Sequence, residues 1–474
     1  MKYDNKPTVS DRLREEAFDF KLLEQAKNYA LDYMGNILNQ PVFPGQEALQ
    51  RLHAFIEPLQ DGPSNPYDIL ENLHLNGSPC TVAQTGGRYF GFVNGGIVPV
   101  ALAAKWLSDS WDQNAGLYVI SPIASVLEDV CEKWLVDLLH LPSETAAGFV
   151  GGSSTATLCG LAAGRNYLLE QQGYDVAKKG LFGAPEIRVI LGEGAHSTVY
   201  KALSILGLGS ERLLKIPADN QGRILTEAVP ELDNRTLLIL QAGNVNTGAF
   251  DDFSALCRKA KDAGCWIHVD GAFGLWAAAS QELGYLVRDV DLADSWSVDG
   301  HKTLNTPYDQ GIILCRKRDA LTQALHMTGS YIIYSNHRDG MLYTPDMSRR
   351  ARSVELWATL KSLGKKGVSE LVEDLHHKAV YFAERLAENG FTIHNKVWFN
   401  QVLASLEHSE LTGKMLSLIQ SSKECWCGGA KWGNHSVIRI SVCSYRTTYG
   451  DIDRSVNTFI EAREKVLGDT PQQI

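Results

Sequence analysis

From residue 148 onward, short apolar runs that favour strands alternate along the chain with longer runs that have helical spacing. The strand-like runs are, in chain order, 148–150, 187–191, 236–241 and 265–269. Helical runs follow the first three and begin near Thr155, Ser197 and Phe253. This alternation predicts an α/β domain built on a largely parallel sheet. Because such sheets bind ligands at the carboxyl ends of their strands, the residues that follow each run are the first candidates for a site.

Helical segments precede this domain. Apolar side chains recur at helical spacing through residues 10–60, with a break at 41–45. Two more helices are predicted within 97–140, and the second begins at Ser121-Pro122, since serine caps helices and proline suits their first turn. We therefore expect an N-terminal helical segment ahead of the α/β domain.

A helical run over residues 349–386 leads to a smaller C-terminal part. Its predicted strands are 391–394, 400–405 and 437–442, and a helix is predicted near 451–466. Strands followed by a helix favour a compact α+β unit. The chain is thus divided into an N-terminal helical segment (1–96), a large α/β domain (97–366) and a small C-terminal α+β domain (367–474).

Composition limits the partners and the compartment. The chain has 474 residues, which is enough for two or three domains, and its formal net charge of -10 argues against nucleic acid or an anionic membrane as the main partner. Its nine cysteines match neither a zinc site nor a disulfide framework, so we expect no metal and reduced thiols in the cytoplasm. The first twenty residues lack the apolar core of a signal peptide, and the apolar segment 96–107 is too short to span a bilayer.

A lysine lies between two apolar runs in the stretch 293–315. A strand-like piece runs into a turn at Asp299-Gly300, His301-Lys302 follows, and the second apolar run is 311–315. Burying an ammonium without a partner is costly, and the usual outcome is a lowered pKa and a nucleophilic amine suited to Schiff-base chemistry. A lysine on a surface turn is the alternative that this stretch alone leaves open.

A glycine-rich turn, Gly151-Gly-Ser153-Ser154-Thr155, lies between a predicted strand and a predicted helix. Glycines let the backbone approach a ligand closely, and the N-terminus of a helix presents free N–H groups to an anion. The turn is a candidate phosphate site, although it lacks the Gly-Lys-Ser/Thr ending of a Walker loop. A simple capped turn is the alternative.

Two further candidates end or follow strand-like runs. Asp270 ends the run that begins at Cys265, and a buried carboxylate there needs a positive partner, such as a protonated pyridine nitrogen. His268 lies on the same strand face and is expected to be a core histidine. His196 follows the run 187–191, and its ring could either stack on a planar cofactor or cap a helix.

Together these residues are the parts needed to hold pyridoxal phosphate, and the sequence resembles the group II pyridoxal-phosphate-dependent decarboxylases. That family includes the aromatic amino acid, histidine and glutamate decarboxylases, and the resemblance extends from about residue 40 to 460. The motifs that carry it are His268-Val-Asp270-Gly-Ala272, Asp294-Ser-Trp, His301-Lys302 with Pro307-Tyr308-Asp309, Ala195-His196-Ser197, Ser121-Pro122 with Leu127-Glu128, and Ser348-Arg349-Arg350 with Leu356-Trp357.

The resemblance implies a fold-type I pyridoxal-phosphate enzyme that forms a homodimer, with active sites at the subunit interface. Lys302 would bind the cofactor as a Schiff base, Asp270 would pair with its pyridine nitrogen, and His196 would stack on its ring. Ala272 would pack on the opposite face of that ring. The remaining cofactor contacts implied are Ser153, Ser154, His301 and Asn244.

The implied reaction is decarboxylation of an L-amino acid to an amine and CO2. Transamination, carbon–carbon lyase chemistry and aldehyde synthesis are alternatives on the same scaffold, and a catalytically silent binding protein is the alternative outside enzymes. The side chains of Phe90, Phe92, Trp111 and Tyr308 fit either an aromatic pocket or packing, so the substrate stays open.

The proton that completes amine formation needs a general acid, and in the animal relatives a loop tyrosine supplies it. The corresponding segment here, 329–348, is shorter and offers Tyr331, Tyr334 and Tyr343. We predict Tyr343, because it lies nearest the Ser348-Arg349-Arg350 motif.

Overall fold

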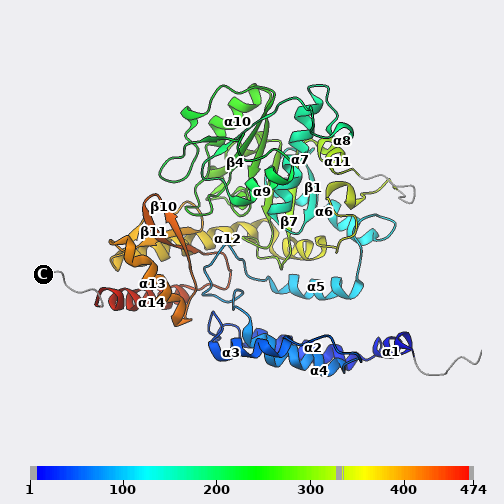
Figure 1. Ribbon diagram of the computed structural model, residues 1–474, viewed down its shortest axis with the longest axis vertical. Helices are drawn as coiled ribbons and strands as arrows, with labels where there is room; N and C mark the ends of the chain where they lie inside the picture. Colours follow the sequence, from blue (N-terminus) through cyan, green and yellow to red (C-terminus); the bar gives the residue numbers. More distant parts are fainter. Residues whose placement is uncertain (1–7, 327–333, 335, 469–474) are drawn as a thin grey trace, which may run out of the picture.

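Two sheets of different size organise the protein in the computed structural model (Figure 1). The structure describes residues 8–326, 334 and 336–468. The larger sheet has the strand order β1-β7-β6-β5-β4-β2-β3, and the smaller has the order β10-β11-β9-β8. The α/β fold with a small C-terminal α+β part, as in fold-type I enzymes, is therefore confirmed.

Most strands of the larger sheet are parallel. Those from β6 through β5, β4 and β2 to β3 pair in parallel, whereas β7 is antiparallel to both β1 and β6. All strands except β7 therefore end at the same edge of the sheet. Their bounds are β1 Ala146–Val150, β2 Arg188–Gly192, β3 Leu214–Ile216, β4 Thr236–Gln241, β5 Trp266–Asp270, β6 Ser295–Asp299 and β7 Gly311–Cys315.

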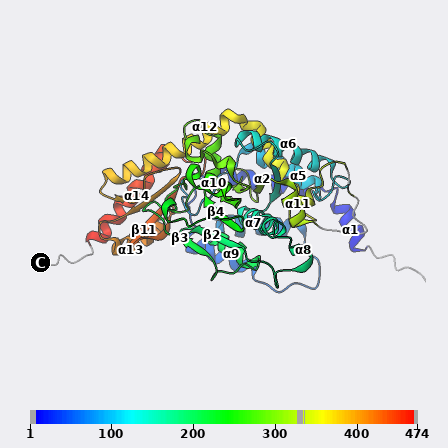
Figure 2. The ribbon, with the colours of Figure 1, turned by 90° about the horizontal axis from the view of Figure 1, so that it is seen from above.

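Helices cover both faces of this sheet (Figure 2). On one face lie α7 Ser153–Glu170, α9 Ser197–Ile205 and α11 Arg318–Leu325, with the short α8 Val176–Lys179 beside them. On the other lie α6 Pro122–Leu138, α10 Phe253–Asp262 and α12 Ser353–Glu388. Successive strand side chains point to opposite faces, so Ile239 belongs to the first core and Leu240 to the second.

The N-terminal helices form a separate layer beside the body of the molecule (Figure 1). They are α1 Val9–Glu16, α2 Phe20–Asn36, α3 Gln46–Gln50 and α4 Pro66–Asn72, and α5 Pro99–Trp111 lies between them and the larger sheet. Ser121 Oγ accepts a hydrogen bond from Ala124 N (3.4 Å), which confirms it as the cap of α6.

Short helical turns connect these elements. The 3₁₀ turns are η1 Arg51–Phe55, η3 Ser78–Cys80, η4 Thr226–Ala228, η5 Gly274–Ala279, η6 Gly284–Val287, η7 Val290–Leu292 and η8 Gly340–Tyr343, and η2 Leu73–Gly77 is a π-helical turn. Within the ranges given above, no helix has the length and apolar character needed to cross a membrane.

The smaller sheet packs its helices on one face. Its strands, all antiparallel, are β8 Thr392–Ile393, β9 Gln401–Ser405, β10 Gly428–Trp432 and β11 His435–Ser441, and the helices are α13 Ser409–Ser422 and α14 Tyr449–Gly468. Leu375 and Phe382 from α12 join Met415 and Phe459 in its core. The three predicted strands and the terminal helix are confirmed, whereas β10 and α13 were not predicted.

Helix α12 begins at Ser353 rather than at Arg349, and it serves both sheets. Gly364 interrupts it with non-helical dihedral angles (φ 62°, ψ 179°). This interruption lies next to the predicted boundary at residue 366. The division into three segments nevertheless stays a prediction.

Candidate active site

Lys302 lies in a loop that leaves β6 and returns to β7. Gly300 N donates to Gln310 O (2.8 Å) and Thr306 N donates to Gly300 O (2.9 Å), so the loop closes on itself. Lys302 Nζ lies 2.9 Å from Asp299 Oδ2, and the lysine side chain is 21% exposed. The lysine is thus paired with a buried carboxylate rather than free on a surface turn.

Asp299 gathers donors from two segments of the chain. Its oxygens accept hydrogen bonds from Ser153 N (2.6 Å) and Ser153 Oγ (2.7 Å), and His301 Nε2 lies 3.7 Å away. Gln310 N donates to His301 Nδ1 (3.1 Å), so the neutral ring carries its hydrogen on Nε2, facing Asp299. Burial lowers the pKa of His301 and favours this neutral form. The donors converge on one anionic group.

The N-terminus of α7 supplies the backbone part of this donor set. Gly152 is its N-cap, and a Cβ placed on Gly152 would have His301 Cε1 as its nearest neighbour at 3.6 Å, so the turn has room on that side. Ser154 is exposed in the first turn of the helix. Helix N–H groups, a serine hydroxyl and an imidazole N–H are the donors that suit a phosphate group.

Asp270 ends β5, the neighbour of the strand that leads to Lys302, and His196 follows β2, on the other side of β4. Burial raises the pKa of Asp270, and His196 and Lys302 offset part of that rise. Asp270 Oδ1 accepts a hydrogen bond from Ala272 N (3.3 Å), but no residue in the described part of the chain forms an ion pair with it. A protonated pyridine nitrogen would supply the cation that this carboxylate lacks.

His196 caps a helix and faces the site as well. It is the N-cap of α9, where Nδ1 accepts a hydrogen bond from Thr198 N (3.3 Å) and lies 2.8 Å from Thr198 Oγ1. Burial lowers its pKa, while the carboxylate of Asp270 opposes that change. Both interpretations of this residue are therefore compatible, because a capping imidazole held neutral and fixed can also stack on a ring.

Asn244 shapes the turn that follows β4. Its Oδ1 accepts hydrogen bonds from Asn246 N (2.9 Å) and Thr247 N (3.3 Å), and its Nδ2 lies 3.3 Å from the position that a Cβ on Gly194 would take. Asn244 is thus placed beside the segment that carries His196.

His268, in contrast, belongs to the core, as predicted. Its Nδ1 lies 2.9 Å from Ser295 Oγ, and burial lowers the pKa of His268 to about 3. A Cβ on Gly160 would lie 2.7 Å from this ring, so the glycine lets α7 pack on it. A histidine that stays neutral under a helix is not a proton carrier.

Sequence reasoning missed Asp299 and Arg439. Asp299 lies three residues before Lys302, and that spacing was the available sign of an ion pair. Arg439 of β11 donates to Val245 O (3.3 Å), and its charge contributes to the lowered pKa of His196. The smaller sheet therefore brings a cation towards the site, which nothing in the local sequence indicated.

Tyr343, the predicted general acid, is bound by two arginines away from Lys302. Tyr343 is buried at the end of η8, and its hydroxyl accepts a hydrogen bond from Arg318 Nη1 (2.6 Å) while the guanidinium of Arg338 lies 4.0 Å from its ring centroid. The structure does not bring it together with Lys302. Tyr334 is exposed, and Tyr331 lies outside the described residues.

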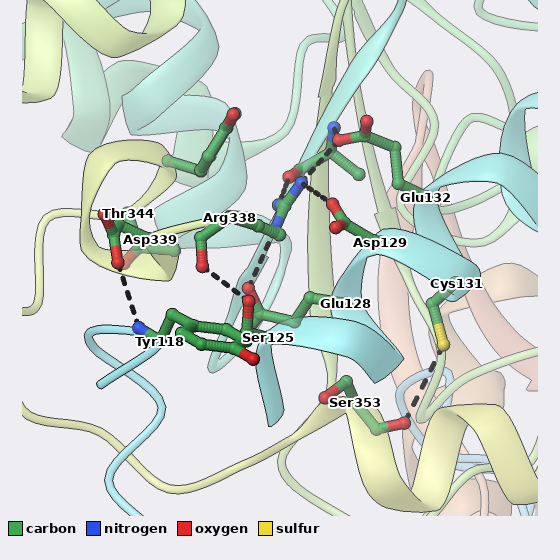
Figure 3. A network of polar contacts seen from close by, with 12 residues as sticks. Tyr118, Ser125, Glu128, Asp129, Cys131, Glu132, Arg338, Asp339, Thr344 and Ser353 are labelled. Atoms are coloured by element: carbon green, nitrogen blue, oxygen red, sulfur yellow. Dashed lines mark hydrogen bonds and ion pairs between the residues drawn. The ribbon is translucent and has the colours of Figure 1, made fainter. Parts of the chain in front are cut away.

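Arg338 is the centre of an ionic cluster, which we call the arginine cluster and define as Glu128, Glu132, Arg318, Arg338 and Arg349. Figure 3 shows Arg338 with Glu128 and Glu132. Arg338 lies 3.1 Å from Glu128 and 2.7 Å from Glu132. Although burial acts to raise it, Arg338, the N–H of Ala147 and Arg318 bring the pKa of Glu132 below its usual value. The cluster attaches the segment from 338 to 349 to α6.

Of the aromatic residues considered for a pocket, Phe90 and Tyr308 lie in different surroundings. Phe90 packs in the core of the smaller sheet, with its ring centroid 5.1 Å from that of Phe382. Tyr308 stacks on His301 at 4.2 Å and is 45% exposed. The first is packing, and the second lies at the site.

The fold, the paired lysine, the unpaired buried aspartate and the anion-binding donors define a fold-type I enzyme that uses pyridoxal 5'-phosphate. Comparison with known proteins agrees: residues 51–406 match the pyridoxal-dependent decarboxylase conserved domain. The chain therefore belongs to the pyridoxal-dependent decarboxylase family, whose members are carboxy-lyases.

Its relatives are distant but cover most of the chain. Aromatic-L-amino-acid decarboxylase from Rattus norvegicus is 25% identical over 446 residues, 88% of this chain and 91% of the relative. Phenylacetaldehyde synthase from Petunia hybrida is 26% identical over 470 residues, 91% of each. The crystal structure of Oryza sativa TDC with PLP and tryptamine superposes with a TM-score of 0.84 at 19% identity, covering 97% of this chain and 99% of that one.

Proposed function

We propose that the protein converts an L-amino acid to the corresponding amine and CO2. The observation that carries this proposal is the placement of Lys302, in contact with Asp299 and close to Asp270, at the carboxyl edge of the larger sheet. Pyridoxal phosphate, when bound, accepts the electron pair that the departing carboxyl group leaves on the α-carbon.

The side chains of this site have separate tasks. Lys302 Nζ would hold the cofactor, and Asp299 lies 2.9 Å from Nζ and keeps it in place. Asp270 would keep a proton on the pyridine nitrogen, because a buried carboxylate without another cation favours one strongly. His196 and Ala272 would pack against the ring of the cofactor, and Asn244 fixes the turn beside His196.

The phosphate would be held at the N-terminus of α7. Ser153 would contribute both N–H and O–H, His301 would contribute Nε2–H, and Ser154 would add a hydroxyl from the exposed side of the first turn. Because both donors of Ser153 are bonded to the carboxylate of Asp299, a phosphate would have to take these hydrogen bonds over from Asp299.

Tyr343 stays our candidate for the general acid, but its observed contacts support a structural role. To reach the α-carbon, its hydroxyl has to leave Arg318 and its ring has to leave Arg338. The same observation favours aldehyde formation as a second candidate function. Without a tyrosine that protonates the α-carbon, O2 could accept two electrons and two protons there to give H2O2, and hydrolysis would release ammonia and an aldehyde. The petunia relative is named for such a product.

We also propose a homodimer in the cytoplasm. The N-terminal helices expose large apolar side chains that a partner subunit would cover: Leu13, Phe18, Phe20, Leu23 and Leu31. Contiguous apolar exposure of this kind is typical of subunit contacts. Light scattering coupled to gel filtration should give twice the chain mass of 52.2 kDa.

A panel of L-amino acids, assayed for amine, CO2, aldehyde and keto acid under air and under nitrogen, tests the reaction. Decarboxylation requires amine and CO2 in equal amounts under both atmospheres. Aldehyde that disappears under nitrogen would establish the second candidate, and keto acid without CO2 would establish transamination. Cofactor binding without any product would indicate a binding protein.

A further inference from the structure

Tyr308 lies on the open side of the lysine loop. Its ring stacks on His301 with centroids 4.2 Å apart and an interplanar angle of 28°. His301 is 8% exposed, whereas Tyr308 is 45% exposed. The tyrosine thus covers the histidine that faces Asp299, and nearly half of its own surface stays exposed beside the lysine loop.

The hydroxyl of Tyr308 is held in a fixed direction. It donates to Asn94 Oδ1 (3.1 Å), and Asn94 Nδ2 donates to Gln84 Oε1 (2.9 Å). Because Gln84 presents an oxygen to Nδ2, the amide of Asn94 is oriented with its own oxygen towards the tyrosine.

Asn94 belongs to a segment that lies against the backbone of Lys302. The next residue, Gly95, donates from N to His301 O (3.3 Å). A Cβ on Gly95 would lie only 2.1 Å from Lys302 O, so the backbone approaches as closely as a glycine allows. Tyr308 and Asn94 therefore form one polar edge beside the lysine, built from two distant parts of the chain.

The free hydrogen-bonding capacity of this edge is mostly that of an acceptor. The tyrosine hydrogen is directed at Asn94, which leaves the lone pairs of Tyr308 Oη unused, and Asn94 Oδ1 keeps a second lone pair. A hydroxyl, N–H or ammonium group would be satisfied here. A carboxylate would face oxygen lone pairs and lose hydration without compensation.

We propose that Tyr308 and Asn94 select the substrate: an L-amino acid whose side chain ends in a hydrogen-bond donor, in preference to one that ends in a carboxylate. This inference rests on the proposed function and names its substrate class. Arg439 is the rival determinant, because a guanidinium would select the opposite class if the substrate side chain pointed towards the smaller sheet.

Two near-isosteric pairs of substrates test the selection in the holoenzyme: L-tyrosine against L-phenylalanine, and L-glutamine against L-glutamate. We expect kcat/KM to favour the donor-ended member of a pair by about tenfold or more, the effect of one hydrogen bond in a buried site. The shift in melting temperature caused by the amine products gives a second readout that needs no turnover. Tyramine is compared with phenethylamine, and 4-aminobutanamide with 4-aminobutanoate.

Tyr308→Phe removes only the hydroxyl, and we expect it to reduce the tyrosine-to-phenylalanine ratio of kcat/KM to within about threefold of unity, whatever its effect on the absolute rates. Tyr285→Phe is the matched control, because Tyr285 is an exposed tyrosine in η6, and it should leave the ratio unchanged. An unchanged ratio in Tyr308→Phe overturns the proposal.

The comparison of the substrate pairs in the wild-type enzyme tests the proposed selection even if the Tyr308→Phe variant does not fold. Preference for glutamate or phenylalanine, or equal use and equal stabilisation within each pair, overturns the selection by Tyr308 and Asn94. Failure of the proposed function gives a different result, because no amino acid would then yield amine and CO2. In that case the shifts in melting temperature still show whether the protein prefers the donor-ended ligand of each pair.

Discussion

The active site and the arginine cluster both contain buried carboxylates, but only in the arginine cluster does each carboxylate have a charged partner in the described part of the chain. In the arginine cluster each carboxylate has arginine partners within 3.1 Å, and Glu132 also accepts from Ala147 N. At the site, Asp270 has a backbone N–H as its partner, and burial raises its pKa. Charges that satisfy one another stabilise a fold, whereas a charge left without its counterpart marks the place where a ligand completes the set.

The largest effect should come from the lysine. Lys302→Ala removes the amine to which the cofactor attaches, so turnover should fall by about 10⁴-fold or more while the fold is retained. Borohydride reduction followed by mass spectrometry should find cofactor on the wild-type chain and none on the variant. Lys366→Ala, on an exposed stretch of α12, is the control. Covalent cofactor in Lys302→Ala would show that another lysine holds it.

In the arginine cluster, we expect a substitution to lower stability while cofactor binding by the folded protein is retained. Arg338→Met removes one of the two arginine partners from each of two buried carboxylates, and we expect the free energy of unfolding to fall by about 3–5 kcal/mol. The folded fraction should keep the visible absorption of the cofactor. Arg235→Met, a surface arginine beside Asp233, should change stability by less than about 0.5 kcal/mol. Urea unfolding followed by circular dichroism measures the free energy of unfolding of both variants. Equal losses would show that the arginine cluster contributes no more to stability than a surface ion pair.

Two buried aspartates, one at the end of β5 and one in the loop between β4 and α10, sharpen the contrast. Asp270→Asn should cut kcat/KM by about 10²-fold with little change in melting temperature, because the pyridine nitrogen loses its negative partner. Asp251 instead accepts from Ile224 N (2.8 Å) and Gln241 N (2.7 Å), so Asp251→Asn should lower stability by about 1–3 kcal/mol and leave the rate of folded enzyme unchanged. A rate within about threefold of wild type in Asp270→Asn would assign that carboxylate a structural role.

The smallest effect concerns Tyr343. If its role is structural, Tyr343→Phe removes the hydrogen bond from Arg318 and should lower stability by about 1 kcal/mol, with amine still the product. If it is the general acid, CO2 release continues and aldehyde accumulates under air. Measuring amine, aldehyde and CO2 together, alongside urea unfolding, distinguishes the two roles.

Much of the larger sheet could be predicted because its strands are short apolar runs bounded by turns. The run 311–315 was predicted with the bounds that β7 has. Its antiparallel direction was not, because direction depends on the length and path of the loop that carries Lys302. Strand β3 was missed since it has three residues, two of them exposed, and β10 was missed because Gly428-Gly429 resembles a turn.

The site was predictable where its residues directly follow strands and less so elsewhere. Asp270 and Lys302 could be predicted as site candidates because each is a charged residue at or just after the end of an apolar run. Tyr343 was chosen by its distance along the chain from the Ser348-Arg349-Arg350 motif, but its position is decided by Arg318 and Arg338, which no local pattern connects to it. The contact between Asn94 and Tyr308 joins residues 214 positions apart, so only the folded chain reveals it.

Helix α12 has a consequence for how the protein melts. Leu356 and Leu360 at one end belong to the core of the larger sheet, while Leu375 and Phe382 at the other belong to the core of the smaller one. The stretch after Gly364 also carries Val368 and Val372 of the larger core, so melting that stretch would expose apolar side chains of both cores. The two sheets should therefore unfold cooperatively, as one calorimetric transition, and amide hydrogens in β9 and β5 should exchange with similar protection.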